Sequence, residues 1–216
     1  MCAGCPPHAR LAWPGVLFAV LFGVAIALIH TALPEGAQPG AQWVEGSEGK
    51  VRAAAVLMPF AGICFLWFIG VVRDGLGHYE DRFFATVFFG SGLLFLAMIF
   101  NASAIGAGLA ASGHLIDVTG ATNDVAAFGQ MALLALTKTY AIRMAAVFMI
   151  SLATIWLKTG LVSRGLVIFT YVVALTLLVA SDVSVWLTLA FPVWVLIVSV
   201  LALSKAGLID LHRDGD

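Results

Sequence analysis

The chain alternates long apolar runs with short polar connections, a pattern typical of helices that cross a lipid bilayer repeatedly. A bilayer core of about 30 Å takes about 20 helical residues to cross. Six apolar runs predict six transmembrane helices, over residues 11–33, 51–72, 83–111, 125–157, 165–180 and 185–203. The fifth run is the shortest, so the topology of the C-terminal part depends on whether it spans.

Composition places the chain outside the soluble globular class. Hydrophobic residues make up 62% and charged residues 11%, whereas a globular domain has about 25% charged residues. The lipid bilayer is therefore the first expected partner. Lys and Arg number 11 against 12 Asp and Glu, so no basic field is available to hold nucleic acid. We divide the chain into a tail (1–10), an all-α six-helix transmembrane domain (11–205) and a C-terminal tail (206–216).

The distribution of cations between the predicted helices sets the orientation, because cytoplasmic loops retain Lys and Arg. With the N-terminus inside, the cytoplasmic side holds seven of them and the outer side four. Both termini are therefore predicted to be cytoplasmic. Aromatic residues collect at headgroup level, and the aromatic residues at predicted helix ends agree with this orientation: Trp13, Trp67 and Trp156 inside, Tyr140 and Trp186 outside.

Two cations, Lys138 and Arg143, lie near the outer end of the fourth apolar run. Arg143 is 15 residues from Lys158 at the inner boundary, or about 22 Å up the helix. It therefore falls in the outer leaflet, and Lys138 reaches the headgroups. Snorkelling to the interface is the ordinary explanation for both side chains, most clearly for Lys138.

Other polar residues fall at a similar height. His30 and Asn101 lie about 27–28 Å up the first and third helices, and Asp182 falls in the outer turn between the fifth and sixth. Polar groups within lipid normally face the protein and pair. We hypothesise an outward-facing ligand-binding pocket in which Arg143 pairs with Asp182. Its hydrogen-bonding neighbours are Asn101, His30 and Tyr140. The alternative is that each residue only caps its helix at the interface.

The third and fourth apolar runs exceed the thickness of a bilayer. As straight helices they measure about 43 and 50 Å. One explanation is a helical hairpin that stands above the membrane, closed by "SGHLIDVTGATND"; the other is a separate interfacial or re-entrant helix over 125–136.

Glycines and prolines within the runs predict local features of the helices. In the third run, close helix packing is expected at Gly90, Gly92, Gly106 and Gly108. Pro59 and Pro192 are expected to kink their helices.

The remaining chemical groups favour no catalytic or cofactor site. Cys2 and Cys5 have C-x-x-C spacing but lie in a short tail without a second such pair. Only His30 falls within a predicted helix, so a bis-histidine haem is not expected. Nucleotide-binding, serine-hydrolase and zinc-protease motifs are absent from the sequence. We therefore expect no cofactor and no metal, and Cys64 reads as a small buried residue.

Three stretches carry a resemblance to small multi-pass bacterial membrane proteins. They are "FLWFIGVVRDGLGHYEDRFFATVFFGSGLLF" (65–95), "YAIRMAAVFMISLATIWLKTG" (140–160) and "FPVWVLIVSVLALSK" (191–205). The resemblance implies a bacterial cytoplasmic-membrane location. It implies no activity, cofactor or substrate, so no functional residue is transferred from it.

Three functions are open. The first is binding or transport of a small anionic or lipidic ligand through the outer pocket, since an anion suits Arg143. The second is a non-catalytic accessory or scaffold subunit, as a homo-oligomer or within a larger membrane complex. The third, an enzyme, has the least support, because no nucleophile, base or metal set accompanies Arg143 in the sequence.

Overall fold

The structure is a computed structural model that describes residues 7–32, 44–76, 82–112, 120–180 and 185–213. The described residues are 97% helical and contain no strand. The predicted all-α class is confirmed for this part of the chain. The helices and their bounds are α1 Pro7–Ala32, α2 Val44–Leu76, α3 Arg82–Ser112, α4 Gly120–Leu134, the π-helical η3 Ala135–Ala141, α5 Ile142–Thr159, α6 Arg164–Ala180, the 3-10 helical η4 Val185–Leu189 and α7 Ala190–Arg213.

Each of the six predicted apolar runs is helical, but they differ in their capacity to cross a bilayer. Four segments are long and apolar enough to span: Trp13–Ala32, Ser47–Gly75, Phe83–Ala111 and Asp124–Thr159. The apolar parts of α6 and α7, Arg164–Ala180 and Trp186–Ala202, are shorter. The structure thus supports a membrane-embedded helical protein, and the six-span topology remains a prediction.

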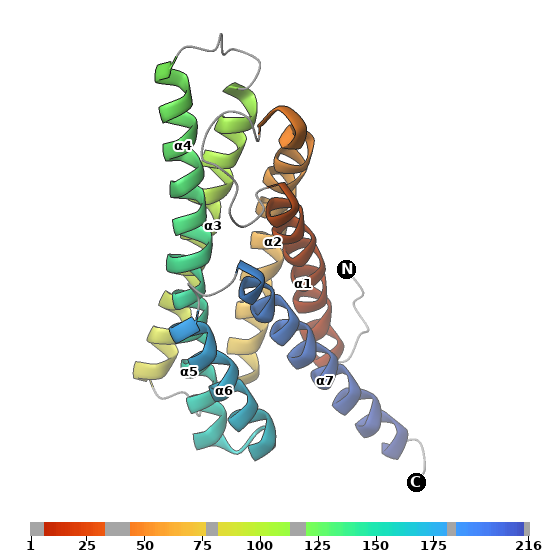
Figure 1. Ribbon diagram of the computed structural model, residues 1–216. Coiled ribbons are helices and arrows are strands. Elements are labelled where there is room, and N and C mark those ends of the chain that lie inside the picture. The colour runs from red at the N-terminus through yellow and green to blue at the C-terminus, as the bar shows by residue number, and fades with distance from the viewer. Residues whose placement is uncertain (1–6, 33–43, 77–81, 113–119, 181–184, 214–216) are drawn as a thin grey trace.

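The fourth run forms one continuous helical column, because α4, η3 and α5 follow each other without a break from Gly120 to Thr159. Figure 1 shows α4 continuing the line of α5 instead of folding over the bundle, and α4 packs beside α3. The arrangement is the extended helical hairpin of α3 and α4, and a separate interfacial helix over 125–136 is wrong.

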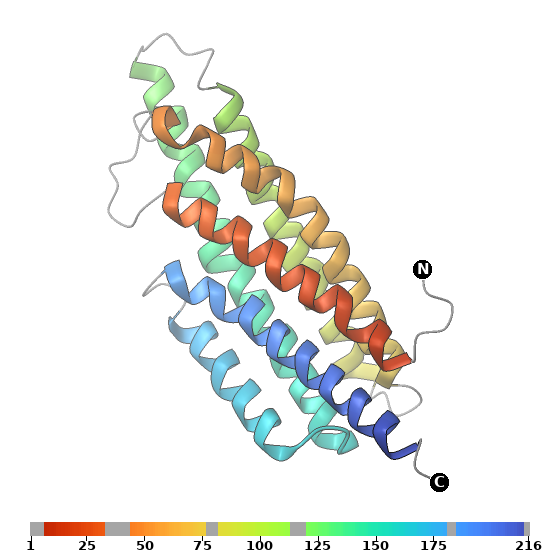
Figure 2. The ribbon, with the colours of Figure 1, turned by 90° about the vertical axis from the view of Figure 1, so that its right-hand side faces the viewer.

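The helices form two groups that share the middle of the bundle. α1 packs against α2 and α7, while α5 packs against α3 and α6, and contacts between α2 and α3 join the groups. α6 and α7 extend only part of the way along the bundle, and α4 and the end of α3 reach well beyond them (Figures 1 and 2). The first residue of α1 and the last of α7 lie toward the same end (Figure 2).

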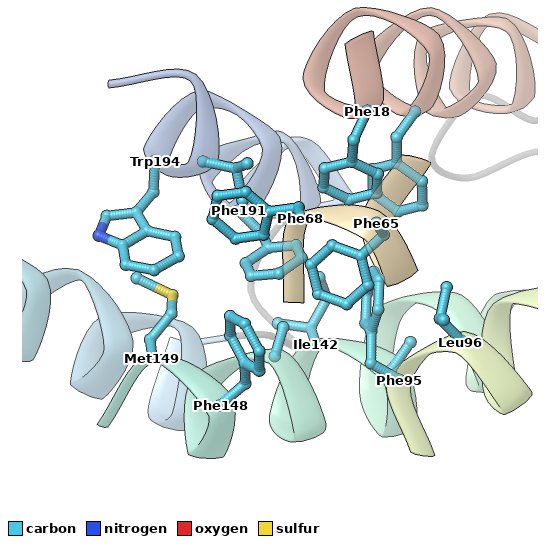
Figure 3. Close-up of a cluster of buried hydrophobic side chains, with 14 of the residues drawn as sticks. Phe18, Phe65, Phe68, Phe95, Leu96, Ile142, Phe148, Met149, Phe191 and Trp194 are labelled. Carbon is cyan, nitrogen blue, oxygen red and sulfur yellow. The ribbon is translucent and has the colours of Figure 1, made fainter. Parts of the chain in front are cut away.

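Aromatic rings fill the centre of the bundle. Phe65 contacts Phe18 with ring centroids 4.6 Å apart, and Phe148 stacks on Phe88 at 4.5 Å. Phe191 of α7 contacts one ring from each of α1, α2, α3 and α5, so the cluster links both helix groups (Figure 3). These rings are Phe18, Phe65, Phe95 and Phe148. These side chains are almost completely buried. The centre is therefore a dry packed core, with rings in tilted and edge-to-face arrangements that aromatic pairs favour.

Close helix approaches occur at glycines that the sequence only partly singles out. A Cβ on Gly92 would lie 2.7 Å from Ile69 Cδ1, and one on Gly106 would lie 3.1 Å from Leu133 Cδ1. Gly90 and Gly108, by contrast, meet nothing within 4 Å in the described chain. Because 3.6 residues make one turn, neighbouring glycines on one helix face different directions. The tightest approach is at Gly15, which periodicity does not mark.

A glycine ends α5. Gly160 adopts a left-handed φ of 66° and donates its N–H to the Trp156 carbonyl at 3.0 Å, a typical helix C-terminus.

Side chains near this end of α5 pack against other helices. The Lys158 ammonium lies over the Phe84 ring, 4.5 Å from its centroid. Trp156 is buried and its ring centroid is 6.3 Å from that of Trp194. Trp156 thus lies near a helix end, as predicted, but its ring packs against Trp194 of α7 instead of being exposed on the surface.

Candidate functional site

The two helical segments that are not α-helical meet in one layer of the bundle. η3 contacts η4, and η4 also contacts α1. We call η3, η4, the last turn of α1 and the start of α5 the η3–η4 layer. A π-helical segment within an α-helix is uncommon and is frequent at functional sites. The layer also contains most of the polar residues that the sequence singles out, so it is the candidate site.

A buried threonine lies within η3. Thr137 is buried, and its hydroxyl donates to the Leu133 carbonyl at 2.8 Å and approaches the Leu134 carbonyl at 3.3 Å. Such side-chain bonds compete with the backbone N–H groups for the same carbonyl oxygens and bend helices. The same bond at Thr154 and Thr170 leaves their helices α-helical, so the Thr137 bond accompanies the widened π turn without being sufficient for it. The π turn changes the direction in which Lys138 and Tyr140 project.

A proline accounts for η4. Pro192 has no N–H, so it cannot donate the α-helical hydrogen bond to the Thr188 carbonyl four residues earlier. The chain adopts a 3-10 turn over Val185–Leu189, and the α-helix begins at Ala190. Pro192 thus occupies the first turn of α7, where proline is tolerated, and the kink expected there is replaced by a change of helix type.

His30 is the buried polar centre of the layer. Its Nε2 lies 3.4 Å from the Thr188 hydroxyl, and both residues are buried. The Trp186 ring stands edge-on to the imidazole, with centroids 5.5 Å apart. Trp186 is itself more than half exposed. The last turn of α1 is therefore joined to η4 by a polar contact inside an otherwise apolar region.

Arg143 lies beside the C-terminal end of α6. The Thr154 and Tyr171 hydroxyls are 2.7 Å apart and set the register of the antiparallel pair α5 and α6. Counting nine residues from this contact brings Ala180, the last residue of α6, level with Ala145, about 3 Å along the axis from Arg143. The last carbonyls of a helix lack intrahelical donors and carry partial negative charge. The half-buried guanidinium is therefore placed near a natural acceptor.

The other members of the hypothesised pocket take different positions. The Asn101 side chain is exposed and donates to the Ala97 carbonyl of its own helix at 2.7 Å. Tyr140 is also exposed and Lys138 is half-buried. Asp182 lies outside the described residues, so its pairing with Arg143 stays a prediction. Asn101 donates an amide N–H within its own helix, in the interior of α3 and not at a helix end.

Several polar contacts between helices were not anticipated from the sequence. The Trp194 indole N–H donates to the Thr170 hydroxyl at 3.0 Å, in a buried site between α6 and α7. Gln130 Oε1 and Ser199 Oγ are buried atoms for which the described part of the chain offers no hydrogen-bond partner. The only available signal was the hydroxyl residues themselves, which are too common in membrane helices to identify their partners. Within the described residues, no three His, Cys, Asp or Glu side chains are grouped to hold a metal; Cys2 and Cys5 lie outside this part.

Comparisons with protein-family models, curated proteins and solved structures find no match. The resemblance to bacterial membrane proteins gains no support from them, so the bacterial origin stays a prediction. Functional assignment therefore depends on the chemistry of the η3–η4 layer: two cationic side chains, a buried imidazole, and hydroxyl groups at one height of an apolar bundle.

Proposed function

We propose that the chain is a six-span membrane protein with both termini in the cytoplasm, and that it binds an anionic headgroup or small anion at the outer side of the η3–η4 layer. Arg143 is the anchor in this proposal, with Lys138 as a second cation. His30, Tyr140, Asn101 and Asp182 complete the hypothesised polar surroundings. The single observation that carries the proposal is a half-buried arginine beside a helix end within an apolar bundle.

The depth of the layer supports an outer-leaflet ligand. Tyr140 lies 18 residues before Lys158, about 27 Å along the column, close to the thickness of a bilayer core. Exposed Trp13 and Trp67 mark the opposite end, and exposed Tyr140 and Trp186 mark this one. Aromatic residues in these two levels fit the two interfaces of one membrane. Arg143 then lies about 5 Å below the outer interface, within reach of a phosphate.

The packed aromatic centre favours binding over transport. Phe18, Phe65 and Phe148 occupy the middle of the bundle with almost no exposed surface. A transported ion or polar solute needs polar groups or water along its path, because unpaired charge in a dry core is costly. Passage through this centre would require these rings to separate, whereas a ligand at the outer layer leaves them undisturbed.

Native mass spectrometry of the full chain tests the proposal. The detergent-solubilised protein is incubated with phosphatidylglycerol, phosphatidylcholine or inorganic phosphate. We expect retained phosphatidylglycerol or phosphate, and at least a tenfold lower retention in Arg143→Ala. Arg52→Ala is the matched control, because Arg52 is an exposed cation near the same end of the bundle and its removal changes the net charge equally. Arg143→Lys keeps the charge but loses the planar guanidinium.

The pattern across probes identifies the ligand. Binding of phosphatidylglycerol alone indicates a lipid headgroup, and binding of inorganic phosphate indicates a free anion. Equal retention by the parent chain, Arg143→Ala and Arg52→Ala would refute an Arg143 site. Unfolding temperatures of all three proteins, measured without ligand, separate a lost site from a lost fold.

A second function, a non-catalytic accessory subunit, is favoured by a different observation. The aromatic core, with almost no exposed surface, is what a purely structural bundle requires. Mild affinity purification from the native membrane distinguishes the two functions. A second polypeptide at constant stoichiometry, retained by Arg143→Ala, supports the accessory role.

A further inference from the structure

We propose that the exposed apolar face of α4 is a docking surface for a second copy of this chain. The face consists of Val125, Phe128 and Met131, which are 69%, 75% and 61% exposed. Their spacing of three residues places them on one side of the helix. The opposite side of α4, with Ala126, Gly129 and Leu133, is buried against its neighbours. The α4 face is thus the uncovered side of a helix that is otherwise packed.

Lipid does not readily cover this face. The inference depends here on the proposed membrane placement. Phe128 lies 30 residues before Lys158, about 45 Å along the column, beyond the hydrocarbon core of about 30 Å and at the outer limit of the headgroups. The Gly129–Leu109 approach puts Ala107 of α3 at the height of Met131. At this height the described part of α3 exposes small residues such as Ala107 and Gly108. Of the two paired helices, α4 is therefore the one that exposes large apolar side chains here.

Exposed Phe, Val and Met side chains in water favour a protein partner, since they stabilise an interface when covered. A second copy in the same membrane has the same orientation and the same height. A two-fold axis along the membrane normal therefore brings the α4 face of one copy onto the α4 face of the other, an isologous contact. Ala127 and Ala132 border the face and let the two helices approach closely. Asp124 lies one turn before Phe128 on the same side of α4, so it forms the outer end of the face, where its carboxylate can remain in water.

The available area is consistent with a dimer held in a membrane. The three side chains expose roughly 400 Å² per copy, if a Phe contributes about 150–250 Å² when fully exposed. A stable complex in solution buries about 800 Å² per partner. Two chains that are confined to one bilayer have already lost part of their translational and rotational freedom, so a smaller contact suffices. The α4 contact accordingly predicts a dimer in bilayers that dissociates in excess detergent.

Disulfide trapping in liposomes tests this inference on the full chain with Cys2, Cys5 and Cys64 replaced by Ser. Phe128→Cys and Met131→Cys are compared with Ala107→Cys, the matched control at the same height on α3. We expect oxidation to cross-link the first two at least tenfold faster than the control, at high lipid-to-protein ratio. Phe128→Ser in the parent chain should lower the dimer fraction, measured by single-molecule photobleaching, with at least a tenfold weaker association.

Similar cross-linking at all three positions, or none at the two α4 positions, would overturn the inference. A parent chain that bleaches only in single steps would overturn it as well, whatever the variants do. Alkaline extraction of the same liposomes checks membrane insertion separately. A chain released by alkali contradicts the proposed membrane placement, whereas an inserted chain that stays monomeric contradicts only the α4 interface.

Discussion

Gly15 offers a sharp test of the packing between α1, α2 and α7. A Cβ at this position would lie 2.0 Å from Ser199 Oγ and 2.8 Å from Phe68 Cδ2. A Cβ on Gly23, two turns further along α1, would meet none of the described residues within 4 Å. Both are interior helical positions, so Gly15→Ala and Gly23→Ala make the same chemical change in crowded and open surroundings.

The magnitude follows from two opposing effects. Ala in place of an interior helical Gly stabilises by about 0.5–1 kcal/mol. At Gly15 the added methyl group must displace Ser199 and Phe68, which are both completely buried, and such overpacking costs about 1–3 kcal/mol. The free energy of unfolding should therefore be about 1–3 kcal/mol lower for Gly15→Ala than for Gly23→Ala.

Thermal unfolding of the purified variants in one detergent measures this difference. For a chain of this size, 1 kcal/mol corresponds to about 2–4 °C. Adding Ser199→Gly to Gly15→Ala should restore part of the loss, because it removes the atom nearest to the new methyl group. Equal unfolding temperatures for Gly15→Ala and Gly23→Ala would refute the close approach of α1 and α7.

Three further tests probe other parts of the bundle by the same measurement. Phe148→Ala should lower the free energy of unfolding by about 3–5 kcal/mol because it empties the aromatic centre, whereas Phe60→Ala, at an exposed ring, should change it little. Gly160→Ala should cost about 1–2 kcal/mol, because an L-residue is strained at a φ of 66°; no loss there would contradict the left-handed helix end. A double-mutant cycle of Thr154→Val and Tyr171→Phe should give a coupling of about 0.5–1.5 kcal/mol for their hydrogen bond, and a coupling of zero would remove the register on which the position of Arg143 relies.

The helical segments were largely predictable because each follows from local chemistry. In lipid, every backbone N–H and C=O must be satisfied within the segment, so a long apolar run has little alternative to a helix. The runs 83–111 and 165–180 match α3 and α6 within a few residues. Trp13 is exposed near the start of α1, as expected, whereas Tyr140 is exposed within the continuous helical column and not at a helix end. Trp156 lies near the end of α5, but its side chain is buried and packs against Trp194 of α7.

The candidate site was predictable only in part. The sequence indicated a polar layer at the height of Arg143, since height along a helix depends on counting residues. It did not indicate the direction in which a side chain projects after the π turn, or that Asn101 bonds its own helix. The first outcome depends on the local helix type of η3, and the second on a bond made within α3.

By itself, the sequence determined the membrane class, the helical content and the approximate depth of the polar residues, because hydropathy and helical rise are properties of each segment alone. Only the tertiary structure decided which segments become neighbours. His30 and Thr188 are 158 residues apart and meet in the η3–η4 layer, and of the four glycines marked in α3 only Gly92 and Gly106 face another helix closely. Lateral contacts depend on the shapes of two surfaces at once, and a one-residue change of helix phase turns a side chain by about 100°.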